Sequence, residues 1–99
     1  MQLYVIRRPS AWASLAELET AGATSARIGD DEMSDRIRWI RSYVVQEPDG
    51  RIGTFCIYEA KDGDAIRDHA RRVGMSGEEF YPVLTTVLVR PDPVEPVPA

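Results

Sequence analysis

The chain has 99 residues, of which 43% are hydrophobic and 28% are charged, and its formal net charge is −4. These values exclude a wholly disordered chain, and the acidic balance argues against a nucleic-acid partner, which needs a clear basic excess. A chain of this length makes one domain whose own core is thin, so a second copy could add stability.

The first third of the chain predicts a strand, a helix and a loop. Residues 2–8 are rich in Leu, Tyr, Val and Ile and predict a strand that ends at Pro9. Ser10 stands where a helix N-cap is expected, residues 11–21 are helix formers, and Gly22 is a natural stop. The polar residues 23–35 predict a loop.

The rest of the chain predicts a hairpin, a second helix and a last strand. Residues 36–46 and 51–60 are the paired strands, joined by a turn around Asp49-Gly50. Asp62 caps a helix over 63–73 that Gly74 ends, residues 75–81 connect, and residues 82–90 form the last strand. The order predicts an α+β, ferredoxin-like β-α-β-β-α-β domain over 1–90 with an antiparallel sheet, followed by a Pro-rich tail over 91–99.

The strands predict a homodimer. Their apolar residues fall on both faces: Val83, Val87 and Val89 point one way in the last strand, whereas Leu84 and Leu88 point the other way. Two helices cover one face only, so the other face needs a second sheet, and the nearest one belongs to another copy. The alternative is a monomer whose loop and tail lie over the open face.

The hairpin assigns side chains to faces. If Asp49-Gly50 is a two-residue turn, Tyr43 lies opposite Cys56 and Arg41 lies opposite Tyr58. The cavity face, between the two sheets of the dimer, then holds residues with polar tips that could bind a small molecule, and the other face lies under the helices. The cavity face contains Trp39, Arg41, Tyr43, Cys56, Tyr58 and Ala60, and the helix face contains Ile40, Val44, Phe55 and Ile57.

Two side chains are candidate metal ligands. His69, the one histidine, lies on the apolar side of its helix, and Cys56, the one cysteine, lies in mid-strand. The ordinary interpretation is a core histidine and a small buried hydrophobe; the alternative is a metal ligand or general base at His69 and a soft ligand at Cys56. One Cys and one His do not complete a site, so a second copy or a carboxylate such as Glu59 or Asp68 must contribute. The assumed register points Cys56 and His69 to different faces.

Cysteine usage and the absence of targeting signals predict a cytoplasmic protein. A single cysteine forms no intrachain disulfide, no stretch is long enough to span a bilayer, and residues 1–8 do not form a signal peptide. No Ser-His-Asp, Cys-x-x-Cys, phosphate-loop or His-Glu-x-x-His pattern is present, so no catalytic residue is predicted.

Residues 38–74 resemble a known family. The matching segments are W-x-x-S-Y from Trp39, C-x-Y-E-A from Cys56 and A-I-R-x-H-A-R-x-x-G over 65–74. With the first and last strands the resemblance covers roughly 70 positions. The family is the actinobacterial-type nickel-responsive, nickel-binding proteins, mostly uncharacterised, and it implies a dimeric α/β barrel and Ni²⁺ or another divalent transition metal, with Cys56 and His69 on motif positions. The acidic residues 30–35 and the Pro-rich tail depart from the family pattern.

Three functions follow. The first is a dimeric metal-binding protein that sequesters or senses nickel through Cys56, His69 and Glu59. The second is a cofactor-free barrel enzyme, a monooxygenase or isomerase, or a small-molecule-binding module, that uses Trp39, Arg41, Tyr43 and Tyr58 in the cavity. The third is an interaction module that docks a partner through its acidic loop and tail.

Overall fold

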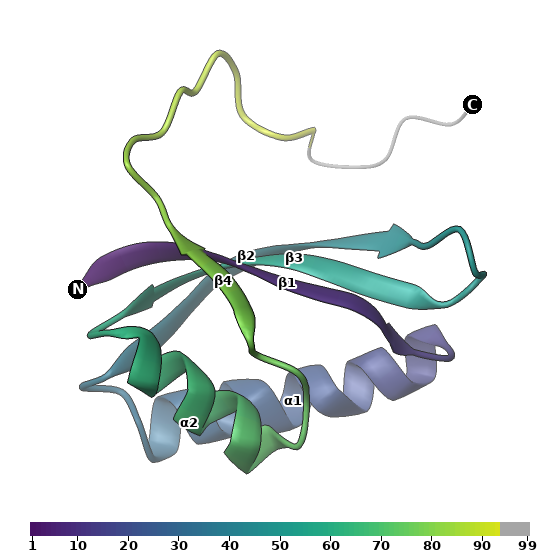
Figure 1. Ribbon diagram of the computed structural model, residues 1–99, viewed down its shortest axis with the longest axis horizontal. Helices are drawn as coiled ribbons and strands as arrows, with labels where there is room; N and C mark the ends of the chain where they lie inside the picture. The colour runs from purple at the N-terminus through teal and green to yellow at the C-terminus, as the bar shows by residue number, and fades with distance from the viewer. Residues whose placement is uncertain (94–99) are drawn as a thin grey trace.

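The computed structural model describes residues 1–93, and its six elements follow the predicted order (Figure 1). All four strands pair antiparallel in the order β2-β3-β1-β4, and both helices cover the same face of the sheet. The α+β, ferredoxin-like fold is therefore confirmed. The elements are β1 (Gln2–Trp12), α1 (Leu15–Asp31), β2 (Ile37–Gln46), β3 (Ile52–Ala60), α2 (Gly63–Val73) and β4 (Glu79–Pro82).

The first helix begins and ends later than predicted. Its N-cap is Ser14, whose Oγ accepts a hydrogen bond from the Glu17 N–H at 3.3 Å, whereas Ser10 lies inside β1 with a φ of 49°. The helix runs through Gly22 and into the predicted loop because Ser25 and Ile28 face the core at helical spacing, while Arg27 between them is exposed. The first helix is therefore confirmed, but its predicted bounds 11–21 are wrong, and the predicted loop 23–35 is helical as far as Asp31.

The second helix is confirmed at both ends. Asp62 caps it by accepting a hydrogen bond from the Ala65 N–H at 2.9 Å. Gly74 ends it with a φ of 85°, a left-handed conformation that favours glycine. Its apolar side contributes Ala65 and Ile66 to a core whose buried members are Ile6, Ile28, Met33, Ile37, Cys56, Tyr58, Ala60, Ala65 and Ile66.

The hairpin turn is one residue longer than predicted, and this changes the faces. Glu47 N–H donates to the Arg51 carbonyl at 2.8 Å and Gln46 pairs with Ile52, so Pro48, Asp49 and Gly50 form the turn. Tyr43 consequently lies opposite Phe55, not Cys56. A shift of one residue reverses the side-chain faces of one strand relative to its partner.

A β-bulge further along β2 separates neighbours that were expected together. Trp39 pairs with Tyr58 but Arg41 pairs with Ile57, with Ile40 as the extra residue. Arg41 and Tyr43 therefore share the open face with Phe55 and Ile57, whereas Trp39 joins the helix-covered face, which also holds Cys56, Tyr58 and Ala60. The predicted placement of Trp39 and of these β3 residues was wrong.

The last strand is short. Of the predicted last strand and the connector before it, only Glu79–Pro82 pairs with β1. The last backbone hydrogen bond between these two segments runs from Val83 N–H to the Leu3 carbonyl at 2.8 Å. The predicted strand 82–90 is therefore wrong: residues 83–93, here called the arm, leave the sheet and arch over its open face (Figure 1). The tail predicted over 91–99 falls largely outside the described residues, and the domain boundary at residue 90 stays a prediction.

Candidate functional site

His69 is buried between the helices and the sheet. It is 1% exposed, and its Nε2 lies 3.1 Å from the Ser25 carbonyl oxygen and 3.5 Å from Ser25 Oγ. A carbonyl only accepts, so Nε2 carries the proton, and Nδ1 has no partner among residues 1–93. Burial, together with the nearby Arg8 and Arg72 charges, lowers the pKa of His69 below its usual value, so the ring is neutral at neutral pH.

Tyr58 connects this histidine to the centre of the sheet. Its Oη lies 3.0 Å from Ser25 Oγ, and its ring lies 5.6 Å from the His69 ring and 6.0 Å from the Trp39 ring, nearly parallel to the latter. Burial raises the pKa of Tyr58 to about 12. The phenol therefore stays protonated at neutral pH and serves as a hydrogen-bonding group.

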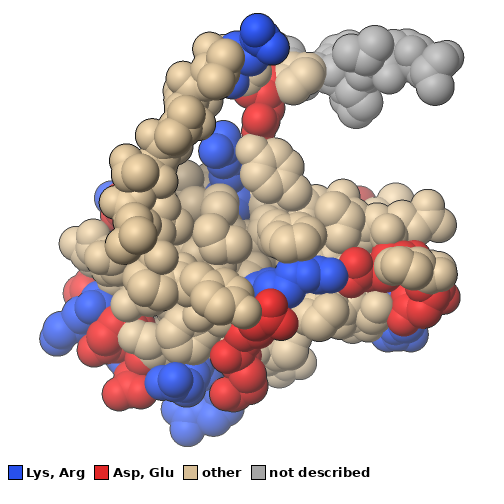
Figure 2. Space-filling view, turned by 45° about the horizontal axis from the view of Figure 1, so that its top comes forward, with Lys and Arg blue, Asp and Glu red and all other residues tan. Residues whose placement is uncertain are grey.

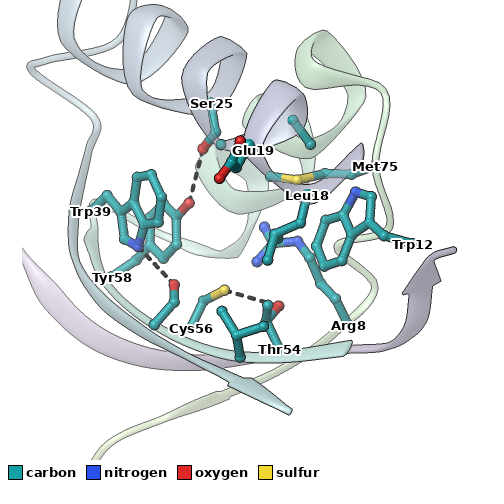
Figure 3. Close-up of a pocket in the computed structure, with 14 residues that line it drawn as sticks. Arg8, Trp12, Leu18, Glu19, Ser25, Trp39, Thr54, Cys56, Tyr58 and Met75 are labelled. Carbon is teal, nitrogen blue, oxygen red and sulfur yellow. Dashed lines mark hydrogen bonds between the residues drawn. The ribbon is translucent and has the colours of Figure 1, made fainter. Parts of the chain in front are cut away.

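A cavity of about 200 Å³ lies next to Tyr58, between α1 and the sheet (Figure 3). Besides Ser25 and Tyr58, two further polar pairs stand in its wall: Cys56 Sγ lies 3.2 Å from Thr54 Oγ1, and Trp39 Nε1 donates to Ser42 Oγ at 2.8 Å. The remaining wall is mostly apolar. The lining residues are Arg8, Trp12, Leu18, Glu19, Ala21, Gly22, Ser25, Trp39, Ser42, Val44, Thr54, Cys56, Tyr58 and Met75.

Arg8 brings a positive charge to this cavity. The side chain is 1% exposed, its Nε donates to the Ser76 carbonyl at 2.8 Å, and its guanidinium lies 5.7 Å from the Tyr58 ring centroid. Its Nη1 and Nη2 are buried and have no hydrogen-bond partner among residues 1–93. Buried charges are normally paired, which makes Arg8 unusual.

The structure does not bring the predicted metal ligands together. Cys56 and His69 lie on the same side of the sheet, contrary to the assumed register, but they have different hydrogen-bond partners. Glu59 pairs with Leu3 on the open face and lies 3.6 Å from Arg38. Within residues 1–93 no group of three His, Cys, Asp or Glu side chains is placed to hold a metal ion. The trio therefore does not fit a nickel site within one copy.

The predicted ligand-binding residues divide between two places. Trp39 and Tyr58 line the observed cavity, which lies beneath a helix and not between two sheets. Arg41 and Tyr43 lie on the open face, as predicted, where Asp92 of the arm accepts a hydrogen bond from Tyr43 Oη at 2.7 Å and lies 3.5 Å from Arg41 Nη1. That hydrogen bond raises the pKa of Tyr43 above its usual value.

Sequence reasoning missed Arg8, Trp12 and Ser25. Arg8 had a usable signal, because Tyr4 and Ile6 precede it at strand spacing and point to the core. Ser25 had none, because the helix that carries it was interpreted as a loop. Trp12 was placed in a helix, whereas it ends β1 opposite Ile52.

The fold and the buried polar groups define a small ferredoxin-like α+β protein with a pocket beneath its first helix. The model of the nickel-responsive SCO4226-like protein family matches residues 4–83. The chain belongs to this family, as the sequence motifs predicted. A comparison with curated proteins gives no match.

A solved structure supports the same fold. The crystal structure of SCO4226 from Streptomyces coelicolor A3(2) superimposes with a TM-score of 0.69 at 14% sequence identity. The match covers 86% of this chain and 99% of that chain. No helix among the described residues is long and apolar enough to cross a membrane.

Proposed function

We propose that two copies of this chain pair through their open sheet faces, and that the homodimer acts as a cytoplasmic binding protein in a response to nickel. The observation that carries the pairing is the exposure of large apolar side chains on that face: Phe55 is 41% exposed and Tyr81 is 57% exposed. Figure 2 shows a broad uncharged area beneath the arm. An apolar surface of this kind on a thin domain favours a self-complementary interface.

The arm supports the same proposal. Its apolar side chains contact little of their own subunit, since Leu84 is 97% exposed and Val87 is 84% exposed. The described arm reaches back to its own sheet through Asp92, which contacts Arg41 and Tyr43, and a hollow lies between arm and sheet (Figure 2). A second copy seated in the hollow would bury the arm's apolar residues as well as the sheet face.

The oligomeric state tests the pairing. Analytical ultracentrifugation of the full chain is expected to give twice the chain mass of 11.1 kDa. Phe55→Glu and Tyr81→Glu place a charge in the interface and are expected to give folded monomers. Leu15→Glu is the matched control, because Leu15 is 60% exposed but begins α1 on the other side of the sheet. A wild-type monomer at all concentrations, or dimers of unchanged affinity in both interface variants, would contradict the proposal.

The response to nickel is proposed from family membership. To sequester or sense Ni²⁺ or another first-row divalent ion, a protein needs several N, O or S ligand atoms close together. Within residues 1–93 of a single copy, Cys56, His69 and Glu59 do not form such a group. Isothermal calorimetry of the wild-type dimer with Ni²⁺ is the direct test. Saturable binding supports a metal-binding role. Heats no larger than the heat of diluting Ni²⁺ would contradict direct metal binding by this protein.

A further inference from the structure

The cavity beneath α1 contains an unpaired buried cation. Arg8 projects from β1, and Figure 3 shows its guanidinium group pointing into the cavity beside Leu18. The Nε is satisfied by the Ser76 carbonyl, but Nη1 and Nη2 have no partner among residues 1–93. Removing a guanidinium from water without an anion or acceptors is costly, so this arrangement favours an anion at the two free nitrogens.

Apart from Glu19 at the rim, the other polar side chains of the cavity wall are paired with one another. The hydroxyls of Tyr58 and Ser25 pair with each other, Cys56 pairs with Thr54, and Trp39 pairs with Ser42. Inside the rim, the unused hydrogen-bond donors of the described wall therefore belong to Arg8. A ligand would meet one cation at one end and apolar surface elsewhere.

The volume limits the ligand. An engineered cavity of about 150 Å³ holds benzene, so the present cavity, of about 200 Å³, suits one ring or a short branched chain with a carboxylate. Two neighbouring guanidinium N–H groups bind both oxygens of a carboxylate in parallel. A phosphate monoester carries more charge than one arginine neutralises between apolar walls, and this favours the carboxylate.

We propose that this cavity binds a small organic monocarboxylic acid, with its carboxylate on Arg8 Nη1 and Nη2 and its apolar body between Trp12, Trp39 and Leu18. The site lies on the helix-covered side of the sheet, so a second copy on the open face leaves it free. The proposal goes beyond the nickel response and does not depend on it.

Glu19 is the internal alternative. It is the one acidic residue among those that line the cavity, it is exposed at the rim, and it makes no salt bridge with Arg8. Rotation of its side chain toward Arg8 would supply the missing anion from within the chain. Glu19→Gln therefore separates an internal counter-ion from a bound ligand.

Tryptophan fluorescence reads this cavity directly, because the only two tryptophans of the chain, Trp12 and Trp39, both line it. The full-length protein is titrated with benzoate and with two control probes. Benzamide has the shape of benzoate without its charge, and inorganic phosphate is an anion without the apolar ring. Benzoate is expected to change the emission saturably, with an affinity about tenfold or more above that of benzamide, because one charge-assisted pair of hydrogen bonds is added. Phosphate is expected to produce no saturable change.

Variants decide the role of Arg8. Arg8→Met is expected to reduce benzoate affinity about tenfold or more and to leave benzamide affinity unchanged. Arg8→Lys is expected to have an intermediate benzoate affinity, because lysine keeps the positive charge but lacks the two parallel N–H donors of the guanidinium group. Arg38→Gln, on the exposed part of β2, is the charge-matched control and should bind as wild type. Glu19→Gln should bind benzoate equally well or more tightly.

Several results would overturn the proposal. Benzoate that binds no better than benzamide would show that water or Glu19 satisfies Arg8, and phosphate that competes with benzoate would make the site a general anion site. Equal benzoate affinity in Arg8→Met and wild type would remove Arg8 from any binding. The benzoate and benzamide comparison uses wild-type protein, so it stands even where Arg8→Met fails to fold.

Discussion

Ser25 Oγ lies 3.0 Å from Tyr58 Oη, and this buried hydrogen bond joins the middle of α1 to the central strand β3. The same serine accepts from His69 through its backbone carbonyl, so one residue of α1 holds two side chains from two other elements. The bond therefore fixes how the helices sit on the sheet, next to the cavity that contains Arg8.

Removal of the Ser25 hydroxyl should destabilise the fold. In Ser25→Ala the phenol of Tyr58 stays buried without its partner, and leaving a buried polar group unsatisfied costs about 1–3 kcal/mol in the free energy of unfolding. Thr24→Ala is the matched control, because that half-buried residue bonds only within its own helix. Urea denaturation measures both variants.

A double-mutant cycle separates this bond from simple loss of packing. Tyr58→Phe alone and Ser25→Ala alone each remove one partner, whereas the double variant removes both and leaves no orphaned hydroxyl. We expect the double variant to be less destabilised than the sum of the two single variants. Strict additivity would mean that the hydroxyls do not stabilise one another.

The free energy of unfolding should decrease as the pH is lowered, because His69 titrates. Burial lowers the pKa of this histidine in the folded state, so below the ordinary histidine value of about 6.5 the unfolded chain binds the proton more readily. The free energy of unfolding is therefore at its full value above that pH and decreases as the pH falls toward the folded-state pKa. Urea midpoints between about pH 8 and pH 5 measure this slope.

The control for this titration uses the fact that His69 is the only histidine of the chain. His69→Gln removes the titrating group, so its stability should be lower overall but flatter over the same pH range. An equal slope in the variant would show that His69 does not cause the pH dependence. Asp68 contributes little to this slope, because its arginine partners hold the pKa of that carboxyl well below the usual range, so it titrates below the pH values measured.

Two glycines should respond to alanine in opposite directions. Gly50 sits in the hairpin turn with a φ of 85°, where a Cβ is strained, so Gly50→Ala is expected to cost about 1 kcal/mol. Gly22 lies inside α1, and a Cβ there would meet Trp39 Cη2 at 3.7 Å, an ordinary contact, so Gly22→Ala should stabilise by up to about 1 kcal/mol. Thermal and urea denaturation of the two variants measure the sign of each change in the free energy of unfolding. Destabilisation by Gly22→Ala would mean that the Trp39 contact is tighter than the geometry indicates.

The elements that sequence reasoning placed correctly are those whose signals are local. Asp62 and Gly74 bound α2 by capping chemistry that involves residues within one helical turn. For the first helix, the predicted N-cap is Ser10, whereas the structure uses Ser14. The choice depended on β1 continuing to Trp12, which is a pairing with β3 across the sheet.

The candidate site was harder to predict because it depends on register. One additional residue in the turn, Pro48, exchanged the faces of β3 and moved Cys56 and Tyr58 from the open face to the core. The bulge at Ile40 then separated Trp39 from Arg41. Neither feature has a strong signature in sequence, although the strand spacing of Tyr4, Ile6 and Arg8 indicated that Arg8 is buried.

Loss of Cys56 or His69 should leave nickel binding by the dimer unchanged. Loss of even an outer partner of a metal site typically lowers affinity about 10–100-fold, so a true ligand would show at least that effect. Both side chains are buried beneath the helices and bonded to Thr54 and Ser25, and within residues 1–93 they lack a third donor. Calorimetry with Ni²⁺ on Cys56→Ala, His69→Ala and, as the open-face comparison, Glu59→Gln measures this directly. Binding abolished in both of the first two variants, with folding intact, would show that the two residues share a metal site after all.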